Sequence, residues 1–82
     1  MVDVIWSPKF EEEFRKTRDS AIKRKVIKQI EKISRNPEIG KPLRYLLKGE
    51  RTVYIKPYRL IYKLEGTDLT LLRFEHRDVV YD

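Results

Sequence analysis

Residues 51–76, RTVYIKPYRLIYKLEGTDLTLLRFEH, decide the fold of this 82-residue chain. Apolar and polar side chains alternate along the segment, and the alternation breaks at Pro57 and again at residues 65–68, where glycine and aspartate favour a turn. A period of two residues is typical of strands that bury one face only. The segment therefore predicts three strands joined by tight turns, over residues 51–56, 58–64 and 69–75.

Upstream of these strands the apolar residues follow the 3.6-residue period of helices. Residues 2–6 are β-rich and predict a first strand, and Ser7-Pro8 supplies the N-cap and first position of a helix that fades near Thr17. A second helix is capped at Asp19 and ends at Asn36-Pro37, because the residue before proline is disfavoured in helices. Its apolar stripe is Ile22, Val26, Ile27, Ile30 and Ile33.

The order of elements, β-αα-βββ with short connections, predicts an α+β fold. We expect one domain over residues 1–82, because so short a chain has no room for a second core. A helical hairpin should pack on one face of a twisted, largely antiparallel sheet of about four strands. The other face would stay open and carry the polar side chains of the strands.

The composition excludes several classes of site. The chain has no cysteine and one histidine, so disulfides and thiolate or imidazole zinc sites are ruled out. The acidic residues lack metal-ligand spacing, and we expect neither a metal nor a cofactor. No segment approaches the roughly 18 apolar residues that a membrane span needs, and no signal peptide is evident. We therefore expect a cytoplasmic protein without membrane association.

The formal net charge of +6 favours polyanionic partners. Basic residues interleaved with tyrosines occur along residues 41–63, and this combination binds phosphates and stacks unpaired bases. A solvated sheet face rich in Lys, Arg and Tyr explains the same pattern. If the surface does bind RNA, the contacts are Lys41, Arg44, Lys48, Arg51, Tyr54, Lys56 and Lys63.

The C-terminal segment carries the groups suited to proton transfer. His76 stands at the end of the last strand, followed by Arg77 and Tyr81, and histidine exchanges protons near neutral pH. A lone histidine is more often structural, and a residue as close to the C-terminus as Tyr81 can be inert. RNA nevertheless offers a metal-free reaction, because its own 2′-OH can attack the adjacent phosphate. Such a reaction needs a base, an acid and cations.

Five motifs together resemble the RelE/ParE superfamily of toxin–antitoxin toxins. They are Ile5-Trp6-Ser7-Pro8-x-Phe10, Asn36-Pro37, Gly40-Lys41-Pro42-Leu43 with Leu47-Lys48-Gly49, Tyr58-Arg59-Leu60-Ile61-Tyr62 and His76-Arg77-Asp78-x-x-Tyr81. The resemblance covers nearly the whole chain and implies the helical-hairpin-on-sheet fold of that superfamily. It also implies a ribosome-dependent mRNA endonuclease, held inactive by a cognate RelB-like antitoxin in a heterotetramer.

The resemblance assigns catalytic roles to Arg59, His76, Arg77 and Tyr81, which we expect on one polar surface. Arg59 and Arg77 would stabilise phosphate charge, and Tyr81 would orient or stack the substrate base. Of the positions matching the strand lysines of the superfamily, only Lys56 keeps the charge, and this shifts proton transfer to His76. Two alternatives stay open: a ParE-like gyrase inhibitor without enzymatic activity, and a catalytically decayed toxin that acts with its antitoxin as a repressor.

Overall fold

The computed structural model describes residues 2–42 and 49–76. Its elements follow the predicted order, with a short 3-10 helix and a two-residue strand added after the second helix. They are β1 (Asp3–Trp6), α1 (Pro8–Lys16), α2 (Ser20–Arg35), η1 (Pro37–Ile39), β2 (Lys41–Pro42), β3 (Glu50–Ile55), β4 (Tyr58–Glu65) and β5 (Asp68–His76).

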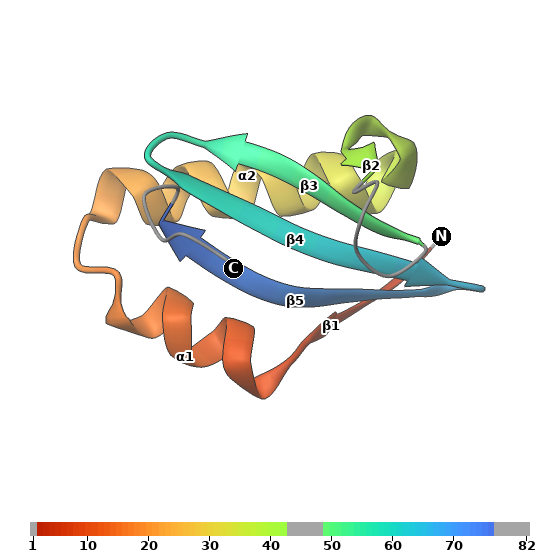
Figure 1. Cartoon of the computed structure of the whole chain (residues 1–82), viewed down its shortest axis with the longest axis horizontal. Coiled ribbons are helices and arrows are strands. Elements are labelled where there is room, and N and C mark those ends of the chain that lie inside the picture. The colour runs from red at the N-terminus through yellow and green to blue at the C-terminus, as the bar shows by residue number, and fades with distance from the viewer. Residues whose placement is uncertain (1, 43–48, 77–82) are drawn as a thin grey trace, which may run out of the picture.

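The strands of the described ranges form one sheet in the order β1-β5-β4-β3-β2. β1 runs parallel to β5, and the other neighbours are antiparallel. Figure 1 shows α2 crossing behind β3 and β4 and α1 lying beside β5, and the two helices contact β3 and β5 respectively. This arrangement confirms the predicted α+β architecture. The sequence did not anticipate β2, because two residues are too few to show a period.

Both helices begin at the predicted caps. The Ser7 hydroxyl accepts a hydrogen bond from the Phe10 N–H at 3.1 Å, and the Asp19 carboxylate accepts from the amides of the following helix. α2 ends at Asn36, as expected from the proline that follows. Ile27 belongs to the apolar stripe of α2, but it is 40% exposed. The buried residues of α2 are Ile22, Val26, Ile30 and Ile33, which are spaced three or four positions apart and share one face of the helix. Ile27 directly follows Val26 and therefore points away from that face.

The core fills the space between the helices and one face of the sheet. On α1, Phe10 is fully buried and meets the Trp6 ring edge-on, with 5.1 Å between ring centroids. α2 contributes Ile22, Val26, Ile30 and Ile33, and the strands contribute Ile55, Leu60, Tyr62, Leu69, Leu71 and Phe74.

A β-bulge at Leu72 reverses the faces of β5 in its second half. Ile61 pairs with Arg73 and Tyr62 with Leu71, so Leu72 has no residue opposite it. The bulge is held from α1, because the Ser7 hydroxyl donates to the Leu72 carbonyl at 3.1 Å. Beyond it, residues with even numbers on β5 face the helices and residues with odd numbers face the open side.

Tyr62 fixes the connection that follows α2 onto the sheet. Its hydroxyl donates to the Pro37 carbonyl and accepts from the Gly40 N–H at 3.0 Å. A Cβ at Gly40 would lie only 2.6 Å from that hydroxyl oxygen, so the close approach requires glycine. In residues 2–42 and 49–76 we find no helix long and apolar enough to cross a membrane.

Candidate functional site

Arg59 lies on the open face of the sheet, in an ion pair with a carboxylate of the neighbouring strand. Its Nε donates to Oε1 of Glu75 at 3.4 Å, and the two residues are direct cross-strand partners. The Arg59 side chain is 22% exposed and that of Glu75 is 6% exposed. Charges so little hydrated interact more strongly than surface charges. Arg59 is therefore held in a defined position with part of its side chain exposed to solvent.

A second arginine–glutamate pair lies on the same face. Arg73 Nη2 is 3.5 Å from Oε1 of Glu50, which is buried. Within the described ranges, the Glu50 Oε1 and the hydroxyl of buried Thr52 make no hydrogen bond. Ile61, between the two pairs on β4, is also fully buried. The open face is thus partly enclosed and holds buried carboxylates beside arginines, unlike an ordinary solvated sheet surface.

The structure does not place His76 beside Arg59. His76 pairs with Tyr58 across the strands, at 5.2 Å between ring centroids, and both rings lie on the helix side with Phe74. The expectation of one shared polar surface is therefore wrong for these two residues. The cause is the bulge at Leu72: without it, His76 would have faced the open side.

His76 instead lines a hollow of about 490 Å³ between β5 and α1, which Glu75 of the arginine–glutamate pair also lines. Lys9, Glu13, Lys16 and Thr17 contribute the helix side of this hollow. Glu13 also accepts a hydrogen bond from the Phe74 N–H at 3.0 Å, which ties α1 to the strand beside the histidine. His76 therefore lies on the helix side of the sheet, and its catalytic role stays a prediction.

The predicted RNA-binding residues are divided by the structure. Tyr54 is 47% exposed and is the cross-strand partner of Arg59 on the open face. Lys63 lies on that face too, 3.5 Å from Glu65, and exposed Lys56 forms the turn between β3 and β4.

Arg51 points to the helix side and donates to the carbonyls of Glu38 and Gly40, at 3.2 Å and 2.8 Å, so it anchors η1. Lys41 lies in β2, at the edge of the sheet. The other predicted site residues, Arg44, Lys48, Arg77 and Tyr81, lie outside the described residues.

Sequence reasoning missed Glu75, Glu50 and Arg73. Two cross-strand salt bridges on one face are a detectable signal only when the register is known. If strands β4 and β5 are paired outward from the turn at residues 65–68 without a bulge, Arg59 lies opposite Phe74. The extra residue at Leu72 moves the partner of Arg59 to Glu75. The carboxylate beside Arg59 was therefore hidden from the sequence.

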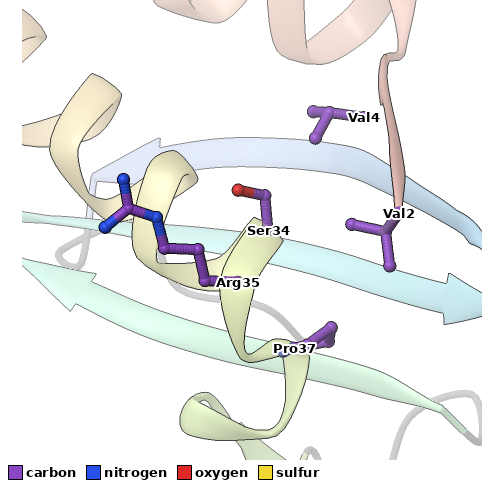
Figure 2. A pocket seen from close by; sticks show the side chains of 5 residues that line it. All are labelled: Val2, Val4, Ser34, Arg35 and Pro37. Atoms are coloured by element: carbon purple, nitrogen blue, oxygen red, sulfur yellow. The ribbon is translucent and has the colours of Figure 1, made fainter.

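A further hollow, of about 670 Å³, lies away from the arginine pairs. Figure 2 shows Val2, just before β1, and Val4 of β1 across from Ser34 and Arg35 at the end of α2, with Pro37 beside them. Its lining is mostly apolar and includes no predicted site residue. Among the residues that the structure describes, we find no group of three or more His, Asp or Glu side chains that could hold a metal ion.

Comparison with known proteins relates the chain to one group. Residues 4–81 match the family model described as the ParE toxin of the type II toxin–antitoxin system parDE. Among solved structures, the RelBE2 toxin–antitoxin complex of Mycobacterium tuberculosis is 29% identical, with a TM-score of 0.79 over 93% of this chain and 98% of that chain. No curated protein sequence gives a significant match.

Two more distant structures share the fold. The isolated RelE toxin of E. coli is 13% identical, with a TM-score of 0.83 over 98% of this chain and 88% of that chain. The heterotetrameric YoeB–YefM toxin–antitoxin complex of Staphylococcus aureus is 18% identical, with a TM-score of 0.74 over 93% and 97% of the two chains. Identities this low support the fold alone.

Proposed function

The chain belongs to the ParE toxin family of type II toxin–antitoxin systems, and from that premise we propose that it is a metal-independent endoribonuclease. Its substrate is messenger RNA on the ribosome, in the cytoplasm. A cognate RelB-like antitoxin neutralises it in a heterotetramer. The toxin–antitoxin complexes among its structural relatives support this partner.

The observation that carries the proposal is the Arg59–Glu75 pair. An arginine that is positioned by a buried carboxylate and keeps part of its side chain exposed is suited to bind a phosphate and stabilise its transition-state charge. In the reaction, the 2′-oxygen forms a bond to phosphorus while the bond from phosphorus to the 5′-oxygen breaks. The 2′-OH loses its proton to a base, and the leaving 5′-oxygen gains one.

Glu75 is the proton acceptor that the open face offers beside Arg59. Its carboxylate is already oriented by the guanidinium, so it needs no rearrangement to stand near a phosphate bound there. Arg77 and Tyr81 complete the proposal as a second cation and a base-stacking ring. His76 serves as the proton donor only if the substrate also reaches the helix side of β5.

Inducible expression with and without the antitoxin tests this proposal. Arg59→Lys keeps the positive charge but not the planar fork, and we expect it to lower message cleavage by about 100-fold. Arg18→Lys, a change on the exposed surface, is the matched control and should arrest growth like the parent. If Arg59→Lys combined with Glu75→Gln still cuts messages like the parent while remaining bound by antitoxin, the assignment fails.

Gyrase inhibition is the second candidate, because the matching family model is described by a ParE toxin. A protein-binding inhibitor needs no proton acceptor on the open face. Mapping message ends and DNA breaks in the same arrested cells separates the two activities. Intact messages with broken DNA would favour gyrase, whereas new message ends with intact DNA would favour the ribonuclease.

A further inference from the structure

Three lysines of α2 lie along one side of the helix, next to the C-terminal end of β3. Lys25, Lys28 and Lys32 are spaced three and four residues apart and are all exposed. Together with Gln29 they line a hollow of about 440 Å³ whose other wall is Tyr54, Ile55 and Lys56. Four lysines therefore line one concavity, and no acidic residue lines it.

This concentration of charge is not offset inside the described part of the chain, where none of the four lysines forms an ion pair. Like charges three or four residues apart destabilise a helix. Their mutual repulsion is relieved when an anion lies between them. The volume of the hollow falls within the range of about 300–1,000 Å³ typical of ligand sites.

Tyr54 lies between the hollow and Arg59. Tyr54 lines the hollow, is 47% exposed and is the cross-strand partner of Arg59. Within the described residues, no strand pairs with β3 beyond Thr52, so the edge beside Tyr54 is not covered by another strand. A chain of phosphates can therefore run from Arg59 past the tyrosine ring to the lysines.

We propose that this hollow binds the backbone of single-stranded RNA, on the same strand that Arg59 holds. The proposal rests on the ribonuclease function and adds a subsite to it. Lysines neutralise the phosphates, and the exposed ring of Tyr54 stacks an unpaired base between the two sites. An acidic peptide would use the lysines equally well, but it would have no use for an aromatic ring beside the phosphate-binding arginine.

A binding measurement without cleavage tests the subsite. The variant is Lys25→Gln/Lys28→Gln/Lys32→Gln, and the control is Arg18→Gln/Arg24→Gln/Arg35→Gln, which removes the same charge from exposed positions elsewhere. The probe is a fluorescent ten-nucleotide single strand, 2′-O-methylated so that it cannot be cut. We expect the Kd of the lysine variant to rise at least tenfold, and that of the control to change by about twofold or less.

The salt dependence adds a second readout. Loss of three phosphate contacts should lower the slope of log K against log salt by about 2, at roughly 0.7 per contact for single strands. Equal Kd values for variant and control would overturn the subsite. The subsite would also be overturned if the lysine variant bound RNA more weakly only when ribosomes are added, or if the protein bound oligoglutamate but not the oligonucleotide through these lysines. Because the probe is not cleaved, a chain that binds it through the lysines but never cuts messages would refute the ribonuclease and leave the subsite standing.

Discussion

Replacing Arg59 by alanine should destabilise the protein as well as disable the proposed site. Glu75 is 6% exposed, so the substitution removes the guanidinium from beside a buried carboxylate. A carboxylate in that position loses most of its hydration and then also its opposite charge. Loss of toxicity in Arg59→Ala alone would therefore not identify a catalytic residue.

The cost can be worked from the geometry of the pair. At 3.4 Å the direct attraction is about 5 kcal/mol for an effective dielectric of about 20, before desolvation is subtracted. Removing one partner of a fully buried pair costs about 3–5 kcal/mol. Because Arg59 keeps 22% of its surface exposed and the contact is long, we expect about 2 kcal/mol. For a chain of this size that lowers Tm by roughly 8–16 °C.

Urea unfolding followed by the fluorescence of Trp6, the single tryptophan, measures this cost. The series is Arg59→Ala, Glu75→Gln and the double variant. Because a neutral amide does not need the arginine, Glu75→Gln should recover part of the loss, with a coupling free energy of about 1.5 kcal/mol. Arg18→Ala is the control and should stay within about 0.5 kcal/mol of the parent.

The Arg59–Glu75 coupling is refuted if the losses in free energy of unfolding of the two single variants add up to that of the double variant within about 0.5 kcal/mol. Additivity would mean that the pair contributes no net stability, and Glu75 would then not be what positions Arg59. The same variants, tested for message cleavage, separate the two effects. A double variant that is as stable as the parent but inactive assigns the loss of activity to the site.

Three further variants test the elements that hold the sheet in register. Burial raises the pKa of the Tyr62 hydroxyl. As pH rises above about 10, this tyrosine therefore ionises in the unfolded chain before it ionises in the folded protein, and the folded protein loses stability. In a Tm–pH series, Tyr62→Phe should lack that loss. The same variant should cost about 1–3 kcal/mol near neutral pH, because the Pro37 carbonyl and the Gly40 N–H lose their partner. Gly40→Ala places a Cβ 2.6 Å from the Tyr62 hydroxyl and should lower the free energy of unfolding by about 1–3 kcal/mol in urea. Ser7→Ala removes a helix cap and the bond to Leu72; it should cost about 1–2 kcal/mol and speed amide exchange around the bulge.

The sequence predicted the elements whose causes are local. The caps at Ser7 and Asp19, the end of α2 before Pro37 and the turn after Glu65 each depend on a few adjacent residues. The architecture followed, because a helical hairpin and three short strands have few ways to share one core. Arg59 was placed on the open face correctly, since alternate residues of a strand share a face and the register between β3 and β4 has no shift.

The composition of the site escaped prediction because it depends on a contact between distant elements. Ser7 donates to the Leu72 carbonyl and Glu13 accepts from the Phe74 N–H, so α1 and its N-cap hold the strand at the extra residue and two residues beyond it. No local feature of β5 announces the bulge, since Leu71 and Leu72 are equally apolar. Yet that one residue decides whether Glu75 or its neighbours face Arg59. The bulge thus connects the N-cap of the first helix to the identity of the proposed proton acceptor, and a stability defect at Ser7 should also appear as a defect at the proposed site.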